Sequence, residues 1–163
     1  MIQPPAAKSP ADSAVEMGEL VLPNDTNTHG AILGGRVLHL MDIAAAMTAM
    51  RHARKPTVTA AMDHVEFLSP IPVGHLIFLK ASVNFVGKTS MEIGVKVLSE
   101  NPQTGELRHT SSAYLTFVAL DPQGRPSSVP PLEPKTEVEK RRYAKGRARM
   151  EKRRKLRGKR EQP

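Results

Sequence analysis

A single segment with helical apolar spacing precedes four segments with the two-residue period of β-strands, and this order restricts the fold more than any other feature. From about residue 34 to residue 50, apolar side chains cover most of the helical circumference, which is typical of a buried helix. Arg51 and His52 place cations at the end of this helix, and Pro56 stops it. The sequence therefore predicts one buried helix that the rest of the domain must cover.

The four later segments are residues 57–68, 75–87, 89–100 and 107–120, and they are separated by turn sequences such as SPIPVG and NPQTGE. Connections this short cannot make a parallel crossover, so we expect an antiparallel meander. Residues 15–23 form another short run that ends in proline, which predicts an edge strand.

These elements predict an α+β fold in which an antiparallel sheet wraps around one long buried helix. Four or five strands would curl only part of the way round that helix. The sheet would then keep open edges, with which a second copy of the chain could pair.

The net charge of +8 is unevenly distributed along the 163 residues. Residues 133–163 contain 14 Lys/Arg and 5 Asp/Glu, a net charge of +9, whereas residues 1–132 have a net charge of −1. We therefore divide the chain into a disordered leader (1–14), one domain (15–132) and a basic C-terminal tail (133–163), joined by the Pro-rich residues 121–134. Two glycines and the lack of an apolar stripe favour a mobile tail that is energetically independent of the domain.

Several classes of chemistry have no support in the sequence. There is no cysteine, so disulfides and thiolate catalysis are excluded, in keeping with a reducing cytoplasm. No apolar run approaches the roughly 20 residues of a membrane helix, and the N-terminus lacks the apolar core of a signal peptide. The histidines lack the spacing of zinc ligands, and no phosphate-binding, dinucleotide-binding or serine-nucleophile motif is present. We expect no metal, no cofactor and a cytoplasmic location.

Gly34 and Gly35 precede the helix, and a lone carboxylate, Asp42, follows seven residues after Gly35. The free N–H groups at a helix N-terminus suit an anion or a developing oxyanion. Seven residues span about 10.5 Å of helix, whereas an oxyanion donor and a base must each lie within about 3 Å of the atoms they act on. If both groups act on one substrate, they come from two copies of the helix, at a dimer interface. The alternative is structural: Asp42 is satisfied by backbone N–H groups or by Arg51, and the glycines only allow tight packing.

The segment PNDTNTHGAILGGRVLHLMD resembles the acyl-CoA thioesterases of the hotdog fold. The matching positions are Pro23, Asp25, Thr26, Asn27, Gly30, Gly34, Gly35, Met41 and Asp42. VTAAMDHVEFLSPIPVGH resembles the family's second strand and following turn, and similar matches continue through residues 86–97 and 113–130. The resemblance covers about residues 15–131 and excludes the tail.

This resemblance implies a catalytic site that agrees with the spacing of the glycines and the carboxylate. It implies hydrolysis of acyl-CoA to free acid and CoA by dimers that pair their sheets edge to edge, often as trimers of dimers. Asp42 would be the general base or the nucleophile. The Gly35 amide of the other subunit, with Gly34, would hold the oxyanion, and Asn27 would orient the water or the carbonyl. CoA would enter only as part of the substrate and product.

The resemblance also raises further binding candidates. Lys88 and Ser90 would contact the CoA phosphates, although a turn lysine is often only solvated. The strand around His64 would contact the pantetheine arm, with His64 on the face opposite Asp63. Many relatives have Asn or Asp at the position of Ala31, where alanine cannot act as the second polar group; His29 and Asn27 are the candidates for that role here.

Two other functions use the same segments. A non-catalytic acyl-CoA sensor would bind the thioester and contact DNA through the tail, but Asp42 is intact and no helix-turn-helix segment is present. A hydratase would need a His–carboxylate pair, which the matching segments lack. The tail has one aromatic residue, Tyr143, so base stacking is poorly supported and nucleic acid is not expected as a partner. An anionic surface, or the polyanionic CoA itself, fits the tail's charge better.

Overall fold

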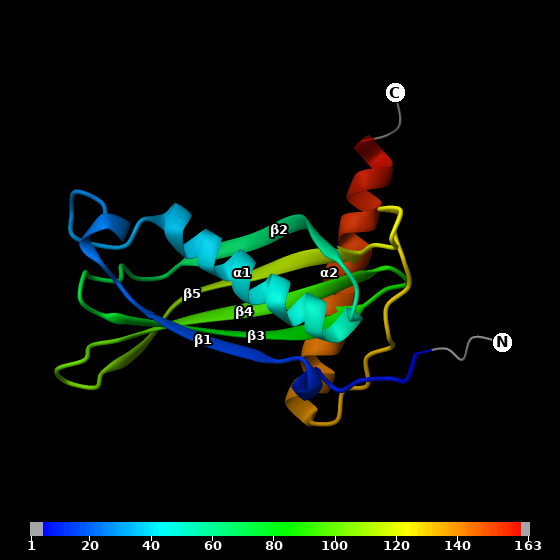
Figure 1. Ribbon diagram of the computed structural model, residues 1–163, viewed down its shortest axis with the longest axis horizontal. Coiled ribbons are helices and arrows are strands. Elements are labelled where there is room, and N and C mark those ends of the chain that lie inside the picture. The colour runs from blue at the N-terminus through cyan, green and yellow to red at the C-terminus, as the bar shows by residue number, and fades with distance from the viewer. Residues whose placement is uncertain (1–4, 161–163) are drawn as a thin grey trace.

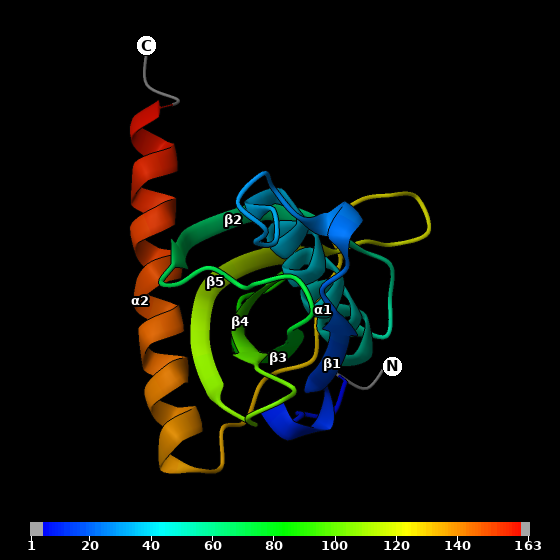
Figure 2. The ribbon, with the colours of Figure 1, turned by 90° about the vertical axis from the view of Figure 1, so that its left-hand side faces the viewer.

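The computed structural model describes residues 5–160 and consists of one five-stranded antiparallel sheet with a helix on each face (Figure 1). The strands are β1 (Val15–Leu20), β2 (Thr57–Phe67), β3 (Leu76–Val86), β4 (Ser90–Glu100) and β5 (Leu107–Ala119), and the helices are α1 (Gly34–Ala53) and α2 (Glu137–Arg160). The strand order is β1-β3-β4-β5-β2. Figure 2 shows the sheet curving round α1, with α2 outside the curve.

Helix α1 fills the concave face of the sheet. Leu40, Met41, Ala44 and Ala45 are buried on it and join a core made with the inward-facing residues of the strands. Arg54, in the left-handed region at φ 53°, ends the helix. The predicted α+β fold, an antiparallel sheet wrapped around one long buried helix, is confirmed, as is the position of β1 at a sheet edge.

The predicted meander is correct for β3, β4 and β5 but wrong for β2, which pairs with β5 at the far edge instead of with β3. The connection between β2 and β3 crosses the open end of the sheet beside the start of α1. There Ile32 N donates to Ile71 O at 2.8 Å and Val73 N donates to Gly30 O at 2.9 Å. Because the curl brings the two sides of the sheet towards each other, this short connection is long enough to cross.

Strand β2 is irregular. Its register with β5 shifts between Thr59 and Ala61 and again between Asp63 and Glu66, and His64 has φ 53°. An extra residue in a strand turns the following side chains to the other face. Asp63 therefore lies opposite Tyr114 and Glu66 opposite Ser112, both on the convex face. A regular strand would have placed Asp63 and Glu66 on opposite faces.

The N-terminal segment is not the disordered leader that we expected, at least from residue 5; residues 1–4 lie outside the described part of the chain. Lys8 N donates to Pro131 O at 2.9 Å, which ties the segment to the chain that follows β5. The Lys8 ammonium donates to His52 O at 2.7 Å and to Arg51 O at 3.2 Å. These carbonyls lie at the C-terminal end of α1, where a cation is favourable. The backbone hydrogen bond to Pro131 and the Lys8 ammonium therefore hold the segment in place.

The prediction of a mobile tail is also wrong for residues 137–160, which form α2 on the convex face of the sheet. A side chain of Glu139 accepts hydrogen bonds from the N–H groups of Lys135 and Thr136, and this capping interaction begins the helix. Tyr143 packs edge-on against Phe85 with the ring centroids 5.0 Å apart, and Met150 is buried.

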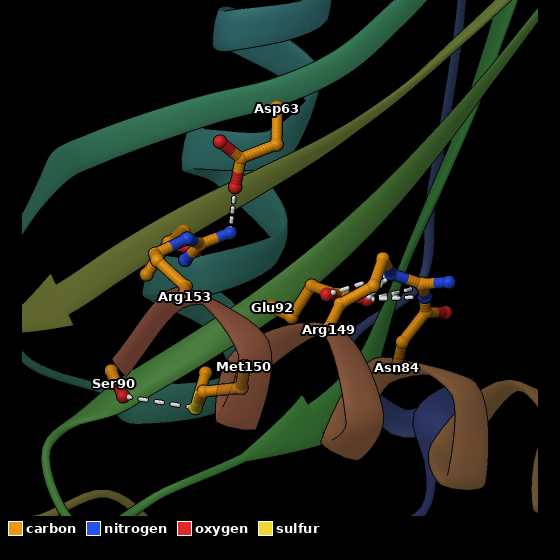
Figure 3. A network of polar contacts seen from close by, with 8 residues as sticks. Asp63, Asn84, Ser90, Glu92, Arg149, Met150 and Arg153 are labelled. Carbon is orange, nitrogen blue, oxygen red and sulfur yellow. Dashed lines mark hydrogen bonds and ion pairs between the residues drawn. The ribbon is translucent and has the colours of Figure 1, made fainter. Parts of the chain in front are cut away.

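The stripe of α2 that faces the sheet is largely charged (Figure 3). Glu92 on β4 is fully buried. Arg149 donates two hydrogen bonds to its carboxylate, from Nη2 to Oε1 at 2.6 Å and from Nε to Oε2 at 3.0 Å. The same guanidinium lies 3.6 Å from the centre of the Tyr114 ring. One turn further on, Arg153 contacts Asp63 and Thr116. The sequence pattern missed this contact because the stripe is not apolar.

Candidate active site

The loop before α1 is held in place by Asn27. The side-chain oxygen of Asn27 accepts hydrogen bonds from His29 N at 2.9 Å and Ala31 N at 3.2 Å. Gly30, at φ 74°, allows the tight turn between them. With its oxygen engaged in the loop, Asn27 keeps its amide N–H groups for an outside acceptor. His29 is exposed at the tip of this turn.

Helix α1 begins with N–H groups that find no acceptor among the residues that the structure describes. Hydrogen bonding to the turn before the helix starts with Arg36 N and Val37 N, which donate to Leu33 O at 2.9 and 3.1 Å. Within residues 5–160, the N–H groups of Gly34 and Gly35 have no recorded acceptor. A Cβ placed on Gly35 would meet no atom within 4 Å. Crowding inside this chain therefore does not require glycine at residue 35, and the open space leaves room for a ligand or another chain.

A groove of about 360 Å³ runs beside this helix end. Asn27 and Gly34 line it together with Val37 of α1, Phe67 of β2 and Ser111 of β5. The ring of Phe67 lies 3.6 Å from where a Gly34 Cβ would be, and 55 % of its surface is exposed. The groove thus combines apolar walls with a few polar groups, as small-molecule sites do.

Asp42 lies outside the groove, further along α1 and facing the edge strand β2. Its Oδ1 accepts a hydrogen bond from Thr59 Oγ1 at 2.8 Å, and its side chain is half-buried. Arg51, the alternative partner, instead donates to Ala14 O. One carboxylate oxygen is therefore oriented by Thr59. The sequence did not single out Thr59, because its position beside α1 depends on β2 pairing with β5.

The other candidate residues lie away from the groove. Lys88 is exposed in the turn between β3 and β4, and the Ser90 hydroxyl lies 3.7 Å from the Met150 sulfur, under α2. His64 lies on the bulge of β2, where its Nε2 is 3.1 Å from Glu66 Oε1. The structure thus brings together Asn27 and the start of α1, places Asp42 with Thr59, and separates Lys88, Ser90 and His64 from both. The ligand contacts of these three residues stay predictions.

His52 is the buried titratable group on α1, and it lies at the opposite end of the helix from the groove. Its Nε2 donates to Pro130 O at 2.9 Å, and Nδ1 has no hydrogen-bond partner in the described part of the chain. Burial lowers the pKa of His52, while the hydrogen bond to Pro130 opposes that shift. His52 is therefore neutral near pH 7 and has a structural position.

Across residues 5–160, no three His, Asp or Glu side chains gather as a metal-binding group, and no helix is long and apolar enough to cross a membrane. The absence of a metal from the reaction stays a prediction.

A helix held in a curved antiparallel sheet, with a groove at its N-terminus, defines a hotdog-fold protein. The family model for the thioesterase superfamily matches residues 29–106. The chain is 41 % identical over 138 residues to the uncharacterized acyl-CoA thioester hydrolase YkhA of Bacillus subtilis, covering 85 % of this chain and 80 % of that protein. It is 48 % identical over 127 residues to the VdlD protein of Helicobacter pylori, covering 78 % and 72 % of the two chains.

Solved structures agree. The acyl-CoA hydrolase of Staphylococcus aureus, solved with butyryl-CoA and CoA, superposes with a TM-score of 0.89 at 37 % identity and covers 96 % of this chain and 95 % of that one. A hexameric acyl-CoA thioesterase has a TM-score of 0.89 at 45 % identity, covering 93 % of this chain and 97 % of that one. The chain belongs to the thioesterase superfamily, among its acyl-CoA thioester hydrolases. It is an enzyme of the thioester hydrolase class.

Proposed function

We propose that this protein hydrolyses acyl-CoA thioesters to a free acid and CoA at a site shared by two subunits. The observation that carries this proposal is the separation of two functional groups on α1. Gly34 lines the groove and, like Gly35, has a free N–H group, whereas Asp42, about 10 Å beyond Gly35 along the axis, does not line it. A second α1 packed antiparallel would bring its Asp42 to the first helix's N-terminus.

In this site Asp42 acts as a general base. Its carboxylate takes a proton from water, and the resulting hydroxide attacks the thioester carbonyl carbon. The Gly35 N–H of the partner subunit, with that of Gly34, stabilises the oxyanion of the tetrahedral intermediate. The intermediate then expels CoA as a thiolate, which takes up a proton. Thr59 holds one oxygen of Asp42 and leaves the other for the water, and the Asn27 amide donates to the carbonyl or the water.

Variants of the Staphylococcus aureus hydrolase support this assignment. Its solved structures include proteins in which one asparagine, one aspartate or one threonine is replaced by alanine. The three replaced residues have the same spacing along that chain as Asn27, Asp42 and Thr59 have here. The match includes Thr59, which was identified here from its contact with Asp42 alone.

The edge strand β2 is the surface through which we propose the two subunits meet. It has one neighbour in the sheet, and Val58 and Phe67 expose 46 % and 55 % of their surface. Pairing two β2 edges would cover these side chains and place the two α1 helices next to each other. Relatives described as hexameric fit a further assembly of three such dimers. A cytoplasmic location, and contacts of Lys88, Ser90 and His64 with CoA, are parts of the same proposal.

Two variants test the shared site. Asp42→Asn should lower kcat on acyl-CoA by about 100-fold or more, the size expected for loss of a general base, without loss of acyl-CoA binding. Gly35→Val should also be inactive, because a side chain would block the oxyanion position. Unfolding and refolding the two variants together should restore activity, since a mixed dimer has one site with neither substitution.

Each variant refolded alone is the control. If the mixture stays inactive although mixed dimers form, the site is not shared. If Asp42→Asn retains turnover, Asp42 is not the base, and if the wild-type protein binds acyl-CoA across a chain-length series without hydrolysing it, the protein is a sensor. A single turnover in ¹⁸O-water tests the general base: it must deliver ¹⁸O to the first acid released, whereas a first acid without ¹⁸O would make Asp42 the nucleophile.

A further inference from the structure

The convex face of the sheet carries a trough next to α2. Side chains on this face form parallel rows across the strands. One row contains Lys80 opposite Lys96, and the next contains Ser82 opposite Gly94. Helix α2 lies over the row after that, where Gly146 closely approaches Asn84 and Glu92.

This arrangement leaves a cavity of about 460 Å³ between the lysine row and the helix. Rows two residues apart are separated by about 7 Å, so the lysine row and the row under α2 lie about 14 Å apart. Ser82 has a small side chain and Gly94 has none, and these two residues form the floor between the two walls.

Both walls of the trough are cationic. Lys80 and Lys96 line one side, and Arg142, Lys145 and Arg149 of α2 line the other. Glu16 is the only acidic residue among those lining the trough; it pairs with Lys80 at 3.3 Å, and Arg149 is engaged by Glu92. Within residues 5–160, Lys96, Arg142 and Lys145 have no recorded ion-pair partner. Three cations therefore converge on the trough without compensation.

The position of Lys96 is unfavourable in the protein alone. It lies directly opposite Lys80 across the strand pair, and like charges in that position destabilise a sheet. A bound anion between the two walls would remove this repulsion and accept hydrogen bonds from lysine and arginine. The width fits two linked phosphate groups better than one, because the cations lie on opposite walls.

We propose that this trough is a binding site for a diphosphate group, separate from the thioester site on the α1 face of the sheet. The ligand is an organic molecule that carries a pyrophosphate linkage. Such a linkage occurs both in free nucleotides and in the head group of CoA.

The test is calorimetric titration of the full-length protein with inorganic pyrophosphate, in magnesium-free buffer of about 0.15 M ionic strength, at which charges more than about 8 Å away are screened. We expect saturable binding of one pyrophosphate per chain and weaker binding of orthophosphate. Lys96→Gln combined with Lys145→Gln removes one cation from each wall and should weaken binding by about 100-fold, since each lost charge-assisted hydrogen bond costs about tenfold.

A matched control removes the same charge elsewhere. Lys152 and Lys155 are exposed on α2 and do not line the trough. Lys152→Gln with Lys155→Gln should change the affinity by less than about twofold, because distant exposed charges are screened. Equal losses in the two double variants, or no saturable binding by the wild-type protein, would overturn the proposal.

Steady-state kinetics with acyl-CoA identify the source of the diphosphate. If the trough holds the CoA head group, pyrophosphate competes with acyl-CoA, and the Lys96/Lys145 variant raises KM. If it holds a separate nucleotide, KM is unchanged in that variant and pyrophosphate does not compete. The calorimetric result is independent of whether the protein hydrolyses acyl-CoA.

Discussion

The two faces of the sheet hold their helices by different forces. Helix α1 packs on the concave face through Leu40, Met41 and a run of alanines that are buried against the strands. Helix α2 packs on the convex face largely through the fully buried Glu92 and the Arg149 that neutralises it. One face is therefore a hydrophobic core, and the other is an ionic contact with a small apolar part.

This difference explains why one helix was visible in the sequence and the other was not. Apolar periodicity reports burial only when the buried side chains are apolar. In α2 the inward positions are Tyr143, Gly146, the adjacent Arg149 and Met150, and Arg153, which follow one another at the three- and four-residue steps of a single helix face. The helical spacing is present, but charged residues and a glycine occupy it.

Removing α2 tests the convex face most severely. Deletion of residues 135–163 should lower the free energy of unfolding by about 2–4 kcal/mol, through lost burial of Met150 and loss of the Tyr143–Phe85 and Glu92–Arg149 contacts. Urea denaturation of the full-length and shortened proteins measures this loss. An unchanged free energy of unfolding would instead support the prediction, made from the composition, that the tail is mobile.

Arg149→Met sharpens the same comparison. Removing one partner of a buried ion pair costs about 3–5 kcal/mol, because the other charge stays buried without compensation. Here α2 can detach from the sheet, and water can then reach Glu92. The cost should therefore approach that of the deletion without exceeding it. Adding Glu92→Gln should recover much of the loss, because the uncompensated charge is gone. A larger loss for Arg149→Met than for the deletion would show that α2 is not a separable element.

A smaller effect is expected at the two glycines of α2. A Cβ on Gly146 would lie 3.0 Å from Glu92 Oε1 and 3.0 Å from Phe85 Cβ, whereas one on Gly158 would meet nothing within 4 Å. Alanine favours a helix over glycine by about 1 kcal/mol. Gly158→Ala should therefore raise or preserve the melting temperature, and Gly146→Ala should lower it, because overpacking costs about 1–3 kcal/mol. If both substitutions stabilise the protein equally, α2 does not approach the sheet at Gly146.

On the concave side, His52 should make the free energy of unfolding depend on pH. Burial lowers its pKa, so the unfolded state binds a proton more readily. The stability from neutral His52 is present above its unfolded pKa of about 6.5 and is lost as pH falls below it, by at most about 1.4 kcal/mol per pH unit. His52→Gln keeps a donor for Pro130 and cannot titrate. Its stability should fall less than that of the wild-type protein between pH 7.5 and 5, and parallel curves would exclude His52 as a source of the pH dependence.

The sequence by itself determined the elements on the concave face. The buried α1, the five strands and the loop with Asn27, Gly34 and Gly35 follow from local patterns of polarity, glycine and proline. The separation of Asp42 from Gly35 also follows, because the rise of a helix is fixed by backbone geometry. For this reason, the spacing of seven residues from Gly35 to Asp42 was enough to predict a site shared by two subunits.

Only the tertiary structure decided which segments become neighbours. Pairing of β2 with β5 places Thr59 against Asp42, and the bulge between Thr59 and Ala61 turns Asp63 towards α2. Docking of α2 depends on Glu92, more than fifty residues away from Arg149. The sequence does not show whether a charged side chain contacts water or a buried opposite charge. That depends on contacts between segments that are distant along the chain.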